Sequence, residues 1–342
     1  MTTGQVDASP RLVATPPRLR WVLAVLGQTA TGKSSLALAL AERYGGEIIN
    51  CDSTAVYRGF DIGTDKVPLE ARRGVPHHLI DIVEPTGDYT AARYAREASQ
   101  TIAEVHGRGR LPIVVGGTGF YYRALTRGLF PGPGRDDRLR DRLRACAARH
   151  SVGFLHRMLA RLDAPSAVRI QPRDQVRLVR ALEVYFLTGR SLTDHFAATV
   201  SPLAGWDVVP VALTLSAADL APRLERRVHD QFERGLLAEI RGLLARGVPE
   251  TAHPFTGLVY RQALEFLHGV RDEAATRELI VRENRHYARR QLIWFRKEPN
   301  LIWFRGSGES PGTFEQVTRA LDAHFEARSQ VRQPGVPDTG TA

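Results

Sequence analysis

The chain has 342 residues, which suits two domains or one domain with a large insertion. Its net charge of +10 is carried by arginine and favours a polyanionic partner, although an Arg-rich surface that is merely solvated gives the same total. No apolar run approaches the roughly 20 residues of a membrane span, and two isolated cysteines, Cys51 and Cys146, exclude a disulfide framework or a cysteine zinc site.

Both ends of the chain lack apolar periodicity. Residues 1–19 and 326–342 are rich in Pro, Gly, Thr and Ser, so we expect them to be disordered. The polar N-terminus has no apolar segment of a secretory signal, and the isolated thiols suit a reducing compartment, so we expect a cytoplasmic location. We also expect a monomer with no membrane attachment and no obligate protein partner, because the sequence shows no spare apolar surface.

Strands and helices alternate in the first third of the chain. This alternation predicts an α/β fold with a parallel, doubly wound sheet flanked by helices. The predicted strands are 21–26, 47–52, 77–83 and 111–115, and the predicted helices are 35–42 and 89–107.

A Pro- and Gly-rich break at 130–134 ends this pattern. The next residues, to about 200, are Arg-dense and helical in pattern, and strand character resumes at 208–215. We therefore predict an all-helical domain at 130–207, inserted into a core formed by 20–129 and 208–325. Long amphipathic helices follow to 298, and 301–304 is a predicted last strand.

The turn after the first strand fits the phosphate-loop pattern of Gly, four residues, Gly-Lys-Ser. Its glycines let the backbone wrap an anion, and its N–H groups and the following helix N-terminus point at phosphate oxygens. The chain contains three lysines, Lys33, Lys66 and Lys297. Because lysine is this rare in the chain, its presence at the lysine position of the motif is not a chance match. We expect a bound di- or triphosphate, held by Gly27, Gln28, Thr29, Ala30, Thr31, Gly32, Lys33 and Ser34.

Two further polar positions follow predicted strands. Asp52 ends the second strand, and strand C-terminal ends line the ligand crevice of a parallel sheet. Asp52 is therefore either a Mg²⁺ ligand or a general base, and the alternative is a turn-forming Asp that caps Ser53 and Thr54. Thr118 offers a hydroxyl in the Gly-rich turn 116–119, where glycines allow close approach of a ligand.

Two motifs of nucleotide-hydrolysing proteins are absent from the sequence, and this limits the function that the phosphate loop can have. Motor-type ATPases carry an acid at the end of a central apolar strand, but the strand at 111–115 is followed by Gly116 and Gly117. No Asn-Lys-x-Asp guanine motif is present. The loop therefore suits a small substrate better than nucleotide-driven motion.

Arginines recur at helical spacing in two segments. Arg173, Arg177 and Arg180 are predicted to lie on one stripe of an inserted-domain helix. A second stripe near the C-terminus has aromatic residues interleaved and comprises Arg282, Arg285, Arg289 and Arg296. Such stripes suit RNA or DNA, with solvated helix faces as the alternative.

Together these motifs resemble the tRNA dimethylallyltransferases, isopentenyltransferases that prenylate N6 of adenosine 37 beside the anticodon. The order and spacing of the segments are specific, whereas any one of them is ambiguous. The resemblance rests on residues 27–34, 52–64, 76–81, 116–121, 180–183 and 288–296.

The resemblance implies that the loop holds the pyrophosphate leaving group of dimethylallyl pyrophosphate, on a P-loop NTPase-like core with the inserted helical domain binding tRNA. Asp52 matches the family's base, which accepts the N6 proton. Thr118 matches the residue near the reacting centre, and Arg227 matches the arginine that neutralises the pyrophosphate. Lys33 and Ser34 match the ligands of pyrophosphate and of its Mg²⁺, which is the expected cofactor.

The resemblance also implies contacts to the tRNA anticodon stem-loop. The chain departs from the usual pattern at Gln28 (usually Pro), which should be tolerated because the glycines, Lys33 and Ser34 remain. It also departs at Ala55 (usually Gln), Val259 (usually Gly) and Ile293 (usually Thr), which puts details of RNA specificity in question. The matched contact positions are Asp52, Ser53, Thr54, Ala55, Thr118, Arg140, Val176, Arg177, Leu178, Val179, Arg180, Thr256, Gly257, Leu258, Val259, Tyr260, Arg261, Arg289, Arg290, Gln291, Trp294, Phe295 and Arg296.

Three alternatives remain. An adenylate isopentenyltransferase performs the same chemistry on free AMP, ADP or ATP, but it needs no second arginine stripe. A small-molecule kinase or an RNA-binding ATPase shares the loop, but the missing acid after Val115 argues against both.

Overall fold

The computed structural model describes residues 20–130 and 132–331. These form two compact units, one up to Tyr122 and from Gly205 onward, the other Arg123–Ala204. The predicted disorder of 1–19 and 332–342 lies outside the described residues. The prediction for 326–331 is wrong, because helix α13 (Pro311–Val331) continues through them and Arg328 pairs with Asp207 at 3.2 Å.

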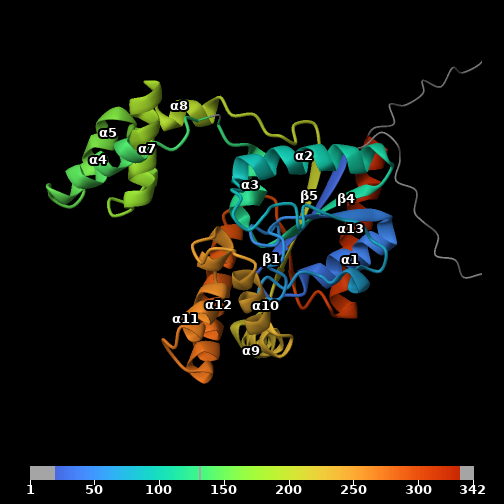
Figure 1. Ribbon diagram of the computed structural model, residues 1–342. Coiled ribbons are helices and arrows are strands. Elements are labelled where there is room, and N and C mark those ends of the chain that lie inside the picture. Colours follow the sequence, from blue (N-terminus) through green and yellow to red (C-terminus); the bar gives the residue numbers. More distant parts are fainter. Residues whose placement is uncertain (1–19, 131, 332–342) are drawn as a thin grey trace, which may run out of the picture. The chain divides into compact units, whose positions relative to one another are not determined.

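A six-stranded sheet forms the first unit (Figure 1), and its order is β3-β2-β4-β1-β5-β6. All neighbouring strands pair in parallel, which confirms the predicted sheet class. The strands are β1 (Trp21–Gly27), β2 (Gly46–Asn50), β3 (His77–His78), β4 (Leu111–Gly116), β5 (Asp207–Thr214) and β6 (Ile302–Arg305).

The central strand β1 is buried on both faces because helices cover the sheet from two sides. Trp21, Leu23 and Val25 pack with α1 and α13 in one cluster. The alternate residues of the strand face the other way, toward the side where α2 packs on β2 and β4. The other helices of this unit are α1 (Lys33–Tyr44), α2 (Ala91–Gly107), α9 (Ala217–Glu233), α10 (Leu236–Ala245), α11 (Tyr260–Leu267) and α12 (Glu273–Phe295), and short 3-10 turns lie at Leu69–Arg72 and His253–Thr256.

Strand β3 is shorter than the predicted strand 77–83. Leu79 and Asp81 have φ of 60° and 55°, in the left-handed region, so the chain leaves the sheet after His78. Asn50 holds this bend, because its side chain donates to Leu79 O at 3.0 Å.

The second unit is all-helical. Its helices pack around an apolar core that includes Leu143, Leu159, Leu178 and Leu182. They are α4 (Asp137–Ala148), α5 (Phe154–Leu162), α6 (Ala164–Arg169), α7 (Gln175–Thr188) and α8 (Leu192–Ala197), and α3 (Gly119–Arg127) contains the boundary between the units.

A buried carboxylate organises the polar side of α7. Glu183 is fully buried and accepts hydrogen bonds from Arg140 Nε at 2.8 Å, Arg180 Nη1 at 2.6 Å and Asp136 N at 2.8 Å. Burial acts to raise the pKa of Glu183, but the bonds from Arg140 and Arg180 outweigh it and lower the pKa to about 2. Two arginines expected to contact RNA therefore also have a structural role.

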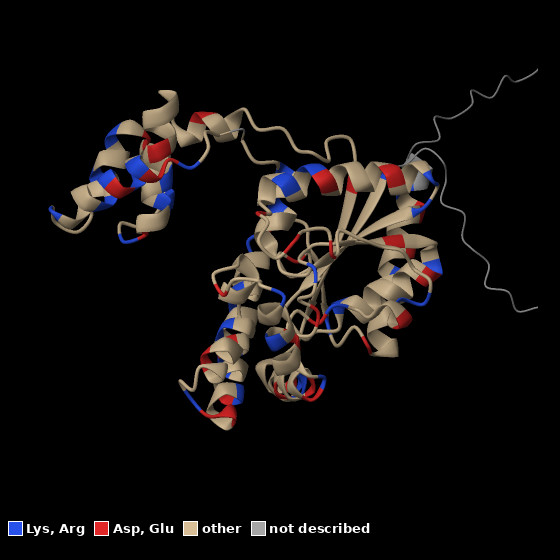
Figure 2. Cartoon of the chain, in the orientation of Figure 1, with Lys and Arg blue, Asp and Glu red and all other residues tan. Residues whose placement is uncertain are grey.

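The predicted stripe on this helix is only partly present. Arg173 precedes α7, whose N-cap is Asp174, so Arg173 does not share a helical face with Arg177 and Arg180. Figure 2 shows Glu as well as Arg along α12. Helix α7 carries one acidic residue, Glu183, beside Arg177 and Arg180. In α12, Arg285 pairs with Glu225 at 2.5 Å.

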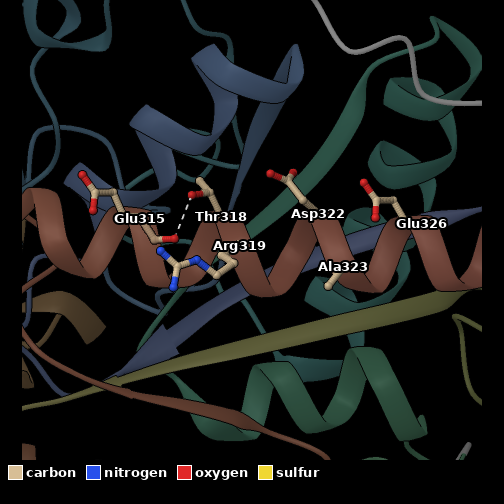
Figure 3. A pocket seen from close by; sticks show the side chains of 6 residues that line it. All are labelled: Glu315, Thr318, Arg319, Asp322, Ala323 and Glu326. Atoms are coloured by element: carbon tan, nitrogen blue, oxygen red, sulfur yellow. Dashed lines mark hydrogen bonds between the residues drawn. The ribbon is translucent and has the colours of Figure 1, made fainter.

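One side of α13 carries a shallow, polar hollow (Figure 3). Glu315, Asp322 and Glu326 lie along one side of the helix there. None of the predicted site residues lines it. Among the described residues, no helix is long and apolar enough to cross a membrane.

We expect Glu183→Gln to destabilise the helical unit by about 3 kcal/mol, because two guanidinium groups lose a buried counter-charge. Hydrogen exchange of α7 amides in the full chain measures this. The stabilisation from Glu183 is present above its unfolded pKa of 4.5 and is lost as the pH falls toward about 2. Asp141→Asn, in an exposed pair with Arg144, is the control and should change little. Equal effects of the two variants would contradict the assignment.

Candidate active site

The phosphate loop leaves β1 directly and leads into α1. Gly27 and Gly32 have φ of 139° and 80°, which favour glycine. A Cβ on Gly27 would lie 2.3 Å from Leu213 O of the neighbouring strand. The first N–H groups of α1, from Lys33 to Ser35, have no helical carbonyl to bind, so they are available to an anion.

A cavity of about 290 Å³ opens beside this loop at the carboxyl ends of the strands. The phosphate loop, Asp52 and Arg227 all contribute to its lining, so the structure brings together three features that are far apart in the sequence. The volume suits a small ligand rather than a large one.

Lys33 is the loop's cation. Its Nζ donates to Gln28 O at 2.5 Å. Burial and the positive charge of Arg227 lower the pKa of Lys33 to about 7, and the carboxylate of Asp52 opposes this shift. A bound anion would restore the ammonium form, so Lys33 is poised to respond to a phosphate ligand.

Arg227 reaches the cavity from α9 and pairs with Asp65, with Nε 2.7 Å from Oδ2. Among the described residues Arg227 Nε has no hydrogen-bond partner, so this N–H remains able to donate to an anion in the cavity. Arg223, one helical turn earlier, also lines the cavity and donates to Ala30 O at 2.7 Å. Arg223 was not among the residues predicted from the sequence, although its spacing of four residues from Arg227 places both on one face of a helix.

Asp52 lies at the end of β2 and lines the cavity. Its Oδ1 accepts hydrogen bonds from Thr54 N at 2.8 Å and Thr54 Oγ1 at 2.6 Å. Oδ1 therefore stabilises the turn, as the turn-forming interpretation predicted. Among the described residues Oδ2 accepts no hydrogen bond, so this oxygen is free to act as a base.

Thr118 lies beside Asp52, where its Oγ1 accepts a hydrogen bond from Ser53 N at 3.1 Å. Its own N–H donates to Cys51 O at 3.2 Å, which joins the turn after β4 to the end of β2. Thr118 is thus close to the predicted base but is not part of the cavity lining.

A loop that follows Asp52 is held by Lys66, to which sequence reasoning assigned no role, and by Tyr260, which was predicted only as an RNA contact. Lys66, another of the three lysines, is buried and pairs with Asp61 and Asp81. Tyr260 accepts a hydrogen bond from Gly63 N at 3.0 Å, and a Cβ on Gly63 would lie 2.5 Å from its ring. The rarity of lysine was the one sequence signal for this cluster.

The donor set near the loop suits Mg²⁺ bound mainly through a ligand's own phosphates. Within the described part of the chain, no group of three or more His, Cys, Asp or Glu side chains is placed to hold a metal. Mg²⁺ prefers oxygen ligands, keeps several waters and needs few protein ligands, and the Ser34 hydroxyl lines the cavity.

A family model and similar known proteins point to the same protein family. The family model described as IPP transferase matches residues 55–298. A protein of Solibacter usitatus named tRNA dimethylallyltransferase is 50% identical over 293 residues, covering 85% of this chain and 94% of that protein. The chain belongs to the IPP transferase family.

Solved structures agree with this assignment. The tRNA isopentenylpyrophosphate transferase of Bacillus halodurans is 34% identical with a TM-score of 0.69, and the match covers 92% of this chain and all of that one. A eukaryotic dimethylallyltransferase acting on tRNA is 26% identical with a TM-score of 0.73, covering 93% and 81%. The predicted resemblance and the predicted core fold are confirmed.

Some predicted tRNA contacts of this IPP transferase family member have buried side chains. Their side chains have little accessible surface, and two of them, Ala55 and Gln291, line the cavity. As RNA contacts, these positions stay predictions. They are Ala55, Leu178, Val179, Val259, Tyr260, Gln291 and Phe295. Val259 has a φ of 78°, which explains why glycine is usual at this position.

The other predicted contacts keep accessible surface. Arg289 and Arg290 on α12 and Arg296 at its C-cap are exposed, and Trp294 is half-buried, with its ring against Gly119. In the helical unit, Val176 and Arg177 are exposed. These positions stay predictions as RNA contacts.

We expect inorganic pyrophosphate to bind with proton uptake at pH 8 to 9, because the free Lys33 has a pKa of about 7 and binding raises it. Affinity should therefore fall as the pH rises above 7. Calorimetry in buffers of different ionisation enthalpy measures the uptake. Lys33→Met supplies the control for the ligand's own titration, and equal uptake by both proteins would contradict the assignment.

Proposed function

We propose that this chain transfers a dimethylallyl group from dimethylallyl pyrophosphate to N6 of adenosine 37 in tRNA, giving N6-(dimethylallyl)adenosine and pyrophosphate. The observation that carries the proposal is the placement of Asp52, Lys33 and Arg227 around one cavity beside the phosphate loop. The names of the relatives support tRNA as the acceptor. The two free thiols and the substrate favour the cytoplasm.

The phosphate end of the cavity holds the leaving group. Breaking the allylic C–O bond leaves the electron pair on pyrophosphate and positive charge on the C5 unit. Lys33, Arg227 and the N–H groups at the start of α1 stabilise the negative charge as it forms. Mg²⁺ held through the pyrophosphate and the Ser34 hydroxyl would add further charge neutralisation.

Asp52 activates the acceptor amine at the other end of the cavity. The lone pair of adenine N6 is delocalised into the ring, so the amine is a poor nucleophile. As the N6–C bond forms, Asp52 orients the amine and accepts its proton, which closes the balance of the reaction. Thr118, beside Asp52, fixes the backbone that carries this carboxylate.

The adenine must leave its stack to reach this cavity. The exposed arginines of α12 are the residues we assign to the RNA backbone, and the half-buried Trp294 suits an unstacked base. A phosphate backbone contact of this kind makes binding sensitive to salt.

The direct test supplies labelled dimethylallyl pyrophosphate and Mg²⁺ with either tRNA or AMP. Label in tRNA alone supports the proposal. Label in AMP alone would instead identify an adenylate isopentenyltransferase. Hydrolysis of ATP without prenyl transfer would rule out both.

Asp52→Asn tests the base. The amide keeps an oxygen to accept the Thr54 hydrogen bonds, so the turn and tRNA binding should persist. We expect turnover to fall at least ~10²-fold, the usual scale for loss of a positioned base. Single-turnover kinetics measure the loss, and near-normal turnover would show that Asp52 is not the base.

A further inference from the structure

Gln291 ties three segments of the site together. It lies on the buried side of α12 with 6% of its surface exposed. Its Oε1 accepts hydrogen bonds from Thr29 N at 2.8 Å and Thr29 Oγ1 at 3.0 Å, and its Nε2 donates to Gly117 O at 3.0 Å. Both ends of the amide are used, so only one orientation of the side chain satisfies this set.

The approach of Gln291 to the turn after β4 requires a glycine. A Cβ on Gly117 would lie 2.3 Å from Gln291 Nε2. The same side chain lines the cavity together with Thr29. Gln291 therefore bridges α12, the phosphate loop and the end of β4 at the wall of the site.

A second glutamine supports this bridge from inside the loop. Gln28 is buried, and its Oε1 accepts from Thr214 Oγ1 at 3.1 Å while its Nε2 contacts Ala288 O at 3.5 Å. Ala288 lies one helical turn before Gln291. The loop is thus attached to successive turns of α12. Gln28 contacts Ala288 and Thr29 binds Gln291, so the backbone between these two loop residues is held by two contacts.

We propose that Gln291 is a positioning residue for the diphosphate rather than an RNA contact. The Thr29 N–H is directed at Gln291 and so is withdrawn from the ligand. This leaves the ligand to the N–H groups at the start of α1 and to Lys33. Without Gln291 the loop has an unpaired N–H beside the cavity and loses its fixed shape.

This inference rests on the proposed function, and Gln291→Met tests it by keeping the side-chain length and removing its hydrogen bonds. We expect the KM for dimethylallyl pyrophosphate to rise about tenfold, the usual scale for a lost buried hydrogen bond, with the KM for tRNA within about twofold. The exposed Glu278 on the same helix gives the matched control, Glu278→Gln, which should leave both unchanged. A rise in the KM for tRNA alone would overturn the proposal.

Gly117→Ala perturbs the same bridge from the other side, because its Cβ displaces the Gln291 amide. We expect the same selective rise in the KM for the prenyl donor. The double variant Gly117→Ala, Gln291→Met should be little worse than either single variant, because each removes the same interaction. Full additivity, or a Gly117→Ala variant with unchanged donor KM, would overturn the proposal.

Binding of inorganic pyrophosphate separates this inference from the proposed function, since it needs no turnover. Calorimetry of Gln291→Met without tRNA should show about tenfold weaker binding than the wild type. If the wild type binds pyrophosphate but transfers no prenyl group, the proposed function fails while this comparison still decides the role of Gln291. Equal pyrophosphate affinity in both proteins would overturn the positioning role.

Discussion

The burial of a lysine beside other cations around one cavity is the constraint on which the site depends. Lys33, Arg223 and Arg227 converge there, and the charge of Arg227 contributes to the lowered pKa of Lys33. Asp65 pairs with Arg227 at 2.7 Å, and Glu309 pairs with Arg223 at 2.8 Å. A diphosphate would add negative charge beside Lys33 and the two arginines, so we expect the cavity to favour a polyanionic leaving group.

The parallel sheet explains why these groups meet. The loop after β1, Asp52 after β2 and Gly117 after β4 all lie at the carboxyl edge, because every described strand runs in the same direction. Arg227 comes from α9 and Gln291 from α12, so the second half of the chain completes a site that the first half begins. Cooperative packing of α12 with α9 and β1 holds these later residues in place.

The parts that sequence reasoning predicted are local in the chain. The phosphate loop and the strands flanking it are read from consecutive residues, and Asp52 follows from its place at a strand end. The role of Gln291 could not be read in this way, because its partner Thr29 is 262 residues away. The early end of β3 depends on positive φ at Leu79, and periodicity carries no signal for that. The burial of Leu178 and Phe295 depends on tertiary packing. The arginines next to them in the sequence suggest an exposed segment instead.

The central claim is that Lys33 and Arg227 receive the leaving diphosphate in this cavity. The most direct measurement is a crystal structure of the full chain with inorganic pyrophosphate and Mg²⁺. We expect pyrophosphate within hydrogen-bond distance of Lys33 Nζ and of the Arg227 guanidinium, with Arg227 released from Asp65. Pyrophosphate bound outside the cavity, or bound within it without contact to Lys33, would contradict the account.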